Sequence, residues 1–506
     1  MWSALRVAAA PPAPAARPLL MAARTSPSLP SLLAGARTSP RRRQHGSAPR
    51  RGLPIDAMPT PGDLPGTPSP ARLHEYVDQR HRQLGPVFRD RIGPVSAVFV
   101  ADPDEMRRTF GLEGKYPMHV LPDAWVHYNQ LYGVKRGLFF MDGEDWLRMR
   151  RLMNPLMMRP DQGDVFSSAC QHVAESLVSR WRAQGTRLIN DLEAQLYKWS
   201  LDTVIAVLMG PLYEAHSHKW NDDVKYLAQN IHKVFLETGN MSLISAKDAQ
   251  EGQLSVWKRF VSTVDTSLTT ARSLVLQMIP LCSDSSAGLL KGMIESGMSE
   301  DDIIKVVIDF IIAAGDTTAL SLQWTLYLLA KNPTVQEQVA TSLSQETDIM
   351  QSALVRGVVR EALRLYPVAP FLTRIMPQSC VIGGYELPPK ARELVLLSLF
   401  TSGRHAKNFP DPEKFWPDRW LRTSHESPHG SYRGVLSPHA SMPFAMGARS
   451  CIGRKLAETQ MITTLTAILR VFQIELLNTE NIDMVLRLVA VPSTPLKLAL
   501  RPRTTI

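Results

Sequence analysis

The segment with the most chemical potential is the decapeptide 444–453, Phe-Ala-Met-Gly-Ala-Arg-Ser-Cys-Ile-Gly, which holds one thiol beside an arginine. Cys451 lies just before a predicted helix, where backbone N–H groups stabilise a thiolate and lower its pKa. Gly447 permits a tight left-handed turn, and Gly453 has no side chain to block a flat ligand. Arg449 supplies a cation for an anionic group near the sulfur. This combination predicts a thiolate that serves as the axial ligand of a haem iron.

A lone cysteine is more commonly a small buried hydrophobe, so the surrounding pattern carries the argument. The spacing F-x-x-G-x-R-x-C-x-G resembles the haem-binding signature of cytochromes P450. The resemblance implies haem b (iron protoporphyrin IX), with Cys451 as its metal ligand and with Phe444 and Arg449 as cofactor-binding residues. The other three cysteines are widely spaced, which predicts neither a zinc site nor a disulfide framework.

A long helix is predicted over residues 299–331. Ser299 is a capping residue, and the three acids that follow it suit the positive end of a helix dipole. The helix can continue to Lys331, because Asn332-Pro333 ends it. At 1.5 Å per residue, a helix of ~32 residues spans roughly 48 Å, enough to cross a whole domain.

The middle of this helix, residues 313–318 (Ala-Ala-Gly-Asp-Thr-Thr), places an acid and two hydroxyls in an apolar stretch. Buried polar groups are costly unless they are bonded, and threonine can bond to a carbonyl one turn earlier. These residues fit either a kinked core helix or a proton relay that faces a cofactor. The run resembles the oxygen-activation motif of P450s, which implies that Asp316 and Thr317 help deliver protons to dioxygen. Ala314 stands where the family often has glycine, and it slightly narrows the expected groove.

Two further segments resemble family motifs that bind or support the haem. Trp146-Leu-Arg-Met-Arg150 resembles the W-x-x-x-R motif, which implies that Trp146 and Arg150 bind a haem propionate, together with Arg449 and Arg374. Arginine suits a carboxylate because its planar fork donates two parallel hydrogen bonds. A tryptophan in such a position is otherwise an ordinary core residue.

Glu361-Ala-Leu-Arg364 places an acid and a base on one face of a predicted helix. It resembles the E-x-x-R motif, and the downstream run 415–420, which contains Arg419, resembles the P-x-R segment. The resemblance implies a buried charge network of Glu361, Arg364 and Arg419 that locks the loop beneath the haem. Its role would be structural, since loss of one partner strands a buried charge.

The remaining pattern predicts a mainly α fold with small β-sheets. Strand candidates are 87–92 and 95–100, followed by a helix that starts at Pro103, and residues 140–370 are mostly helical in pattern. Strand character returns at 385–400, an irregular loop is expected over 404–443, and two short strands are expected around Pro492 within 486–500. The resemblance implies the cytochrome P450 fold, a helical domain plus a smaller β-rich region, over residues 71–506.

The N-terminal segment explains most of the net charge of +10. Residues 1–51 contain nine arginines and no acid, so ten minus nine leaves about +1 for the remainder. This composition predicts a mitochondrial targeting leader over 1–51, although a merely disordered tail has a similar composition, and it argues against a nucleic-acid-binding body. Residues 52–70 are expected to form a proline-rich connector. The sequence lacks a run of 18 or more apolar residues, so a membrane-spanning helix is not expected.

The chain has length for one P450 domain and contains no Gly-rich dinucleotide fingerprint, so electrons are expected from a separate protein. The resemblance to mitochondrial P450s implies an acidic [2Fe–2S] ferredoxin, reduced by an NADPH-dependent reductase, and peripheral association with the matrix side of the inner membrane. Basic residues on predicted helices are either solvated faces or its docking site: Arg356, Arg360, Arg454 and Lys455.

Segments that supply substrate contacts in the family are apolar here, which fits a large hydrophobic substrate such as a sterol, although core packing explains the same residues. The expected pocket residues are Trp125, Phe139, Phe140, Phe310, Ala314, Val368, Phe371 and Val491. The runs 135–141, 365–371 and 485–489 resemble the Halloween group of arthropod mitochondrial P450s. That likeness implies hydroxylation of carbon 2 of an ecdysteroid, converting 2-deoxyecdysone to ecdysone.

Three alternatives remain open at the level of sequence. Hydroxylation of another ecdysteroid or sterol carbon uses the same residues. A P450 that rearranges peroxides needs neither dioxygen nor a redox partner, and the intact Asp316-Thr317 pair argues against it. A haem-binding carrier or sensor without turnover is the third reading, which a test for product would exclude.

Overall fold

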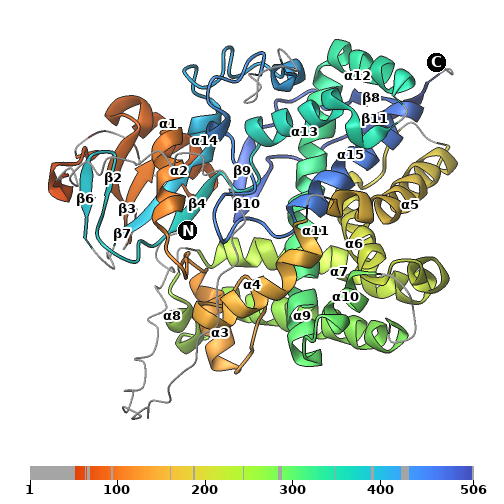
Figure 1. Ribbon diagram of the computed structural model, residues 1–506, viewed down its shortest axis with the longest axis horizontal. Helices are drawn as coiled ribbons and strands as arrows, with labels where there is room; N and C mark the ends of the chain where they lie inside the picture. Colours follow the sequence, from red (N-terminus) through yellow and green to blue (C-terminus); the bar gives the residue numbers. More distant parts are fainter. Residues whose placement is uncertain are drawn as a thin grey trace, which may run out of the picture.

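The computed structural model describes residues 52–62, 64, 66, 69–92, 95–159, 161–185, 188–242, 244–282, 288–346, 348–388, 393–422 and 432–503. The leader predicted for residues 1–51 lies outside these ranges. Figure 1 shows a β-rich region on the left and a larger helical region on the right, with helix α11 between them. This arrangement confirms the expected mainly α fold with small sheets.

The largest sheet has the strand order β2-β3-β7-β4. Strand β2 pairs antiparallel with β3, β3 pairs parallel with β7, and β7 pairs antiparallel with β4. The two strands expected at 87–92 and 95–100 are confirmed, and Phe88 stacks on Phe99 between them at 4.9 Å. The strands of this sheet are β2 (Val87–Ile92), β3 (Val95–Val100), β4 (Phe371–Arg374) and β7 (Glu393–Ser398).

Three smaller sheets complete the β-structure described, with orders β1-β6-β5, β10-β9 and β11-β8. The C-terminal segment was expected to hold two strands around Pro492, whereas the structure has a hairpin that Pro492 ends and a separate strand after it. Proline fits a strand end because it has no N–H to donate. The strands are β1 (Leu53–Pro54), β5 (Cys380–Ile382), β6 (Tyr385–Leu387), β8 (Phe472–Leu476), β9 (Met484–Arg487), β10 (Val489–Pro492) and β11 (Leu498–Pro502).

The proline-rich segment expected to be a connector is packed onto the β-rich region. Leu53 and Pro54 pair in parallel with Tyr385 and Glu386, and Met58 is 3% exposed in a hydrophobic cluster with strand residues. Prolines suit this edge position, since an edge strand leaves one side of its backbone unpaired. The described part of this segment therefore belongs to the folded domain.

The helices form the bulk of the molecule, and α11 crosses its centre (Figure 1). The side chain of Ser299 accepts a hydrogen bond from the N–H of Asp302, and α12 begins with Pro333, so both predicted ends of α11 are confirmed. The helices are α1 (Leu73–Leu84), α2 (Pro103–Leu112), α3 (Asp123–Leu131), α4 (Gly143–Met157), α5 (Gln162–Ala183), α6 (Leu192–Met209), α7 (Leu212–Asn240), α8 (Ala246–Glu251), α9 (Ser255–Cys282), α10 (Leu289–Glu295), α11 (Glu300–Lys331), α12 (Pro333–Gln345), α13 (Ala353–Leu365), α14 (Leu399–Gly403) and α15 (Arg454–Val471).

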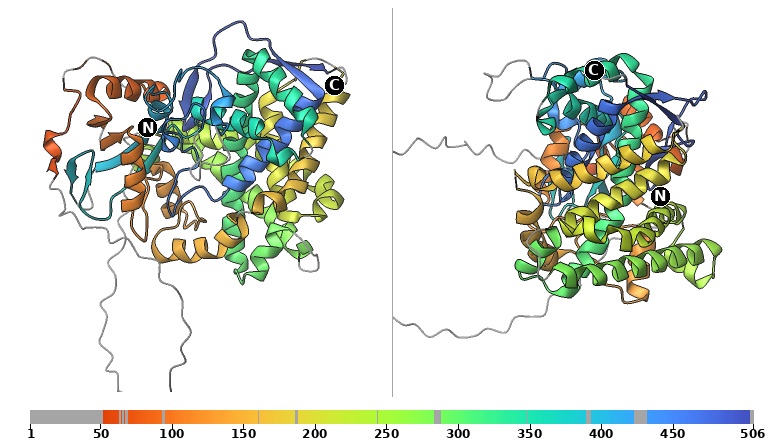
Figure 2. Two further views of the ribbon diagram at one scale, coloured as in Figure 1. Left: turned by 45° about the horizontal axis from the view of Figure 1, so that its top comes forward. Right: turned by 90° about the vertical axis from the view of Figure 1, so that its right-hand side faces the viewer.

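Helix α11 packs against α6, α7, α9, α13 and α15, and α15 lies along α5, as both views in Figure 2 show. One large hydrophobic cluster joins these helices, and it includes Trp199 and Trp324, which are both fully buried. The irregular loop expected over 404–443 contains only the short 3₁₀ turns η4 (Pro417–Trp420) and η5 (Pro438–Ala440) in its described part. Within the ranges given above, every helix is too short or too polar to cross a membrane.

Candidate active site

The loop before α15 presents Cys451 on a tight turn. Gly447 has φ of 79°, as its predicted left-handed conformation requires, and a Cβ there would collide with the carboxylate of Glu113. The N–H of Cys451 donates to the carbonyl of Phe444 at 2.9 Å, which closes the loop. A Cβ at Gly453 would lie 3.9 Å from the sulfur, an ordinary van der Waals contact, so this glycine lies directly beside the thiol.

The electrostatics of Cys451 differ from the expectation that the helix end would lower its pKa. Burial raises the pKa of the Cys451 thiol, and this effect outweighs the N–H of Gly453 and the charges of Arg150 and Arg454, which lower it. The residue nevertheless retains accessible surface. The thiol is therefore crowded by protein atoms and still accessible on part of its surface. Metal binding would deprotonate such a thiol in any case, because a coordinating sulfur is a thiolate.

One face of α11 is also accessible. Between Val306 and Ala330, only four residues of this otherwise buried helix keep accessible surface: Phe310, Ala313, Ala314 and Thr317. Their spacing of three, four and seven residues places them on a single face. Because α11 and α15 pack against each other, this accessible face and the Cys451 loop lie on neighbouring elements. The face is lined by small and apolar groups, as room for a ligand requires.

Thr317 and Asp316 differ in exposure and in partners. The hydroxyl of Thr317 donates to the carbonyl of Ala313 at 2.8 Å, the bond one turn back that was anticipated from sequence. Asp316 is 1% exposed, and both of its carboxylate oxygens lack a hydrogen-bond partner among the described residues. Burial raises the pKa of Asp316, so its protonated form is favoured more than in water.

Several arginines converge on the Cys451 loop. Arg150 of α4 donates to the carbonyl of Ser450 at 2.8 Å, and Arg374 of β4 donates to the Glu113 carboxylate at 2.6 Å. Within the described chain, Nε of Arg150 and Nη2 of Arg374 are buried without partners. Buried unpaired donors call for an explanation, and the carboxylates of an anionic ligand provide one. These donors therefore fit the propionates of a haem.

Arg449 and Trp146 support one another beside these donors. The Arg449 guanidinium lies over the Trp146 ring at 4.6 Å, and it donates to the carbonyls of Pro117 and Met141, each at 2.6 Å. It also pairs with Asp142 at 2.5 Å. Arg449 thus ties α4 and the preceding loop to the cysteine loop, and Trp146 is 2% exposed beneath it.

Sequence reasoning missed His119, which lies beside the same arginines. Met118 and Ile375 form an isolated β-bridge, so the loop that carries His119 runs next to Arg374 at the end of β4. Both ring nitrogens are buried, and neither has a partner in the part of the chain that the structure describes. Burial, aided by Arg449 and Arg374, lowers the pKa of His119 to about 3, so the ring is neutral at neutral pH. The sequence held no signal for it, since only the long-range bridge brings it there.

Glu361, Arg364 and Arg419 meet in a buried cluster. Both arginines donate to Glu361 at 2.8 Å, and all three side chains are 0% exposed. Trp420 donates to the second oxygen of Glu361 at 2.9 Å, while Arg364 also donates to the carbonyl of Gly403 at 2.6 Å. The one carboxylate is shared by two guanidiniums, and main-chain carbonyls accept the remaining arginine donors, so every buried charge in the cluster is hydrogen-bonded, as buried ions require. The cluster fixes the irregular loop that leads to Cys451.

The expected pocket residues separate into two groups. Phe310 and Ala314 lie on the accessible face of α11, and a small apolar cluster beside it joins Val368 and Val491 to Leu320. Half-buried Phe371 packs at the border of the main core. The residues of this first group come from three separate segments of the chain.

The second group centres on Trp125, whose ring also lies under the guanidinium of Arg136, the partner of Asp309 on α11. Its ring meets Phe260 of α9 edge-on at 5.6 Å, and its Nε1 donates to Thr238 of α7 at 3.0 Å. Phe140 lies against Trp125, whereas Phe139 is 52% exposed and contacts His119. Trp125 thus packs between α7 and α9, and its assignment to the pocket stays a prediction.

The basic residues lie on α13 and at the start of α15, two helices in contact. Arg360 donates to the Tyr432 hydroxyl at 3.2 Å, and Arg356 donates to the carbonyl of Met350. Arg454 is exposed and pairs with Glu458 at 3.1 Å, while Lys455 is partly exposed. Each keeps some accessible surface.

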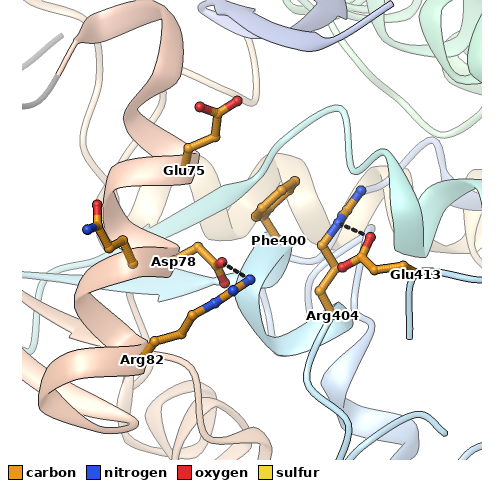
Figure 3. Close-up of a pocket in the computed structure, with 7 residues that line it drawn as sticks. Glu75, Asp78, Arg82, Phe400, Arg404 and Glu413 are labelled. Atoms are coloured by element: carbon orange, nitrogen blue, oxygen red, sulfur yellow. Dashed lines mark ion pairs between the residues drawn. The ribbon is translucent and has the colours of Figure 1, made fainter. Parts of the chain in front are cut away.

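A separate cleft lies away from the Cys451 site. Figure 3 shows it between α1 and the α14 region, with a volume of about 370 Å³. Its charges pair with each other, Arg82 with Asp78 at 2.7 Å and Arg404 with Glu413 at 3.3 Å. It shares no residue with the Cys451 site, and its internal ion pairs leave little charge for a ligand.

Comparison with known proteins finds one matching family and several similar proteins. The family described as Cytochrome P450 matches residues 54–500. The protein "Cytochrome P450 315a1, mitochondrial" of Drosophila melanogaster is 36% identical over 476 residues, covering 90% of this chain and 88% of that protein. "Cytochrome P450 11B2, mitochondrial" of Rattus norvegicus is 29% identical over 450 residues, covering 85% of each. "Cholesterol side-chain cleavage enzyme, mitochondrial" of Oncorhynchus mykiss is 28% identical over 451 residues, covering 85% of each.

Proposed function

The chain belongs to the cytochrome P450 family, and from that premise we propose that it hydroxylates carbon 2 of an ecdysteroid, converting 2-deoxyecdysone to ecdysone. Members of this family are haem-thiolate monooxygenases, so the reaction class and the cofactor, haem b, follow from membership. The substrate and the position hydroxylated are the proposal. Bound haem supplies dioxygen activation, a chemistry that side chains do not perform.

The observation that carries the proposal is that two accessible surfaces lie on neighbouring elements, the Cys451 loop before α15 and one face of α11. Cys451 offers a sulfur on one element, and the Phe310–Thr317 face of α11 offers small and apolar groups on its neighbour. Cys451 would hold the haem iron through its sulfur. The face of α11 would then border the space above it, where substrate and dioxygen bind.

The residues around the cysteine loop would hold the haem through its carboxylates. Arg150 and Arg374 have buried donors available, and neutral His119 can donate from one ring nitrogen. Arg449 and Trp146 would position the loop and contribute to the cofactor edge, and Phe444 would pack near the sulfur. The Glu361 cluster would support this site mechanically from below.

Two residues on α11 would manage protons. Thr317 lies on the accessible face, where its hydroxyl can pass a proton, and Asp316 is the adjacent buried acid whose raised pKa favours a bound proton. Neither residue would contact the sulfur side. Their roles are to hold and move protons while the protein excludes bulk water from the reacting carbon.

The substrate assignment draws on the lining and on the relatives. The residues on and beside the accessible face of α11 are apolar, which suits a steroid nucleus: Phe310, Ala314, Val368, Phe371 and Val491. Relatives carry names that denote mitochondrial P450s, and one is named for cholesterol side-chain cleavage. Another ecdysteroid or sterol carbon is the alternative within the same class.

The electron donor would be a mitochondrial [2Fe–2S] ferredoxin, reduced by its NADPH-dependent reductase. Opposite charges steer such encounters, and the proposed basic surface is made by Arg356, Arg360, Arg454 and Lys455. The location would be the matrix side of the inner mitochondrial membrane, with peripheral association. The relatives named as mitochondrial support this location.

The test is reconstitution of the holoenzyme with ferredoxin, reductase and NADPH. Offered 2-deoxyecdysone beside other ecdysteroid precursors, the enzyme should give ecdysone, identified by mass spectrometry and comparison with the authentic compound. Product at another carbon would overturn the regiochemistry and keep the enzyme class. Product formed without ferredoxin would instead favour peroxide-dependent chemistry.

A further inference from the structure

We infer that His232, together with Glu193 and Tyr197, forms the route by which Asp316 regains protons from solvent. This inference rests on the proposed role of Asp316 as a proton source, and it adds the residues that would serve that source. All three lie outside the cysteine loop and the apolar pocket. Two come from α6 and one from α7, the helices that pack against α11.

The geometry begins at the buried acid. Nδ1 of His232 lies 3.7 Å from Oδ1 of Asp316, an ion-pair distance that a small side-chain rotation would shorten to a hydrogen bond. The side chain of Asp316 is 1% exposed, whereas that of His232 is 25% exposed. His232 is therefore the group through which this acid communicates with the exterior on the α7 side.

The next members lie on α6. The hydroxyl of Tyr197 is 3.0 Å from Nδ1 of His232, and Oε1 of Glu193 is 3.6 Å from the same nitrogen. The side chain of Glu193 is 35% exposed, so exposure rises in sequence from Asp316 through His232 to Glu193. One imidazole nitrogen thus lies between an inner and an outer carboxylate, with a phenol fixing the ring.

The charges around His232 suit proton exchange. The titratable and charged groups that face it are Asp316, Glu193, Tyr197 and Arg487. Its interaction with Asp316 raises the pKa of His232, against the effects of burial and Arg487. Burial also raises the pKa of Glu193 and that of Asp316. All three groups are thereby shifted toward the protonated form.

The proton balance closes without a further reagent. Each turnover consumes dioxygen, two electrons from the ferredoxin and two protons, and it yields hydroxylated product and water. When Asp316 releases a proton toward Thr317, its carboxylate takes the Nδ1 proton of protonated His232. His232 then takes a proton from the carboxyl of Glu193, which regains one from solvent. Only O–H and N–H bonds form and break, and the net change is one proton moved inward.

The first experiment compares His232→Gln and Glu193→Gln with His218→Gln, the same histidine change at an exposed position of α7. In the reconstituted holoenzyme, His232→Gln should lower kcat about tenfold, less than the ~100-fold loss expected when a direct proton donor is removed. In the wild type, kcat should fall at alkaline pH as His232 loses its proton. His232→Gln should remove this fall, lower the amount of product per NADPH and enlarge the solvent isotope effect. Glu193→Gln should change the same measurements in the same direction but by a smaller amount. His218→Gln should leave them at their wild-type values. Wild-type coupling and pH profile in both His232→Gln and Glu193→Gln would overturn the inference.

The second experiment does not depend on turnover or on the substrate. In the diamagnetic reduced carbon monoxide complex, the His232 resonance of histidine-labelled protein is assigned by its loss in His232→Gln. It should titrate above the ordinary pKa of histidine, 6.5, and shift downward in Asp316→Asn. Coupling between these two residues would persist even if the substrate proposal failed. A titration unaffected by Asp316→Asn would overturn the relay alone.

Discussion

Arg374 donates from Nε to Oε2 of Glu113 at 2.6 Å, and both side chains are about 5% exposed or less. The other oxygen of Glu113 accepts from the N–H of Ala448 at 2.9 Å, so one carboxylate joins the end of α2 to β4 and to the cysteine loop. Glu113 lies outside every motif in the sequence. Its contacts hold three distant segments of the chain together at the site.

Removal of this carboxylate should destabilise the protein. Glu113→Gln keeps the size of the side chain but leaves the buried Arg374 without its anion, which costs about 3 kcal/mol in comparable cases. Urea unfolding of wild type and variant, followed by circular dichroism, measures the difference. Arg72→Gln, at an exposed ion pair with Asp483, is the control and should change stability little. Equal stability of Glu113→Gln and wild type would refute the role of Glu113.

Thr317→Ala should separate electron consumption from product formation. The hydroxyl lies on the accessible face of α11, so its loss removes a proton donor while the pocket remains, and product formation should fall about 100-fold. NADPH oxidation should fall far less. The control is Thr325→Ala, since Thr325 makes the same bond one turn back but is buried elsewhere on α11. Unchanged coupling in Thr317→Ala would contradict the assignment.

The buried histidine His81 should make the protein sensitive to acid. Its ring nitrogens lie 2.9 Å from the Ser398 hydroxyl and 3.0 Å from the Gly85 carbonyl, and burial lowers its pKa from 6.5 to about 4. Between pH 6.5 and 4 the unfolded state binds more protons, so this residue stabilises the fold above pH 6.5 and loses that effect as pH falls toward 4.

The measurement is the free energy of unfolding at several pH values. His81→Gln should be less stable at neutral pH, yet its stability should fall less steeply below pH 6.5, by up to about 1.4 kcal/mol per pH unit. Parallel curves for variant and wild type would show that His81 is not the titrating group.

Reversal of a charge on the proposed docking surface should weaken the association with ferredoxin. Lys455→Glu should raise KM for ferredoxin about tenfold and reduce its salt dependence, while kcat at saturating ferredoxin stays near that of wild type. Lys247→Glu, on α8, is the control and should leave KM unchanged. An identical KM in Lys455→Glu and wild type would remove this residue from the docking surface.

The sequence predicted what local patterns determine. Ser299 and Pro333 bound α11 because capping and proline chemistry act within a few residues, and Glu361 meets Arg364 because i, i+3 residues share a helix face. The motif around Cys451 likewise predicted the left-handed Gly447.

Contacts between distant segments were beyond that reasoning. His119 and Glu113 reach the site only through tertiary pairing with β4, and His232 reaches Asp316 only through the packing of α7 on α11. The pKa of Cys451 was predicted in the wrong direction, because burial outweighs the helix end. The place of Trp125 in the pocket stays a prediction, because an aromatic residue near an apolar loop has the same composition whether it lines a cavity or packs against a helix.

The most direct test of the account is the absorbance spectrum of the reduced carbon monoxide complex. The wild-type holoenzyme should show the red-shifted Soret band that marks a thiolate opposite carbon monoxide, and Cys451→Ala should lose this band while Cys170→Ala retains it. A red-shifted band that survives Cys451→Ala would contradict the account, because the sulfur at the iron would then have to come from another residue.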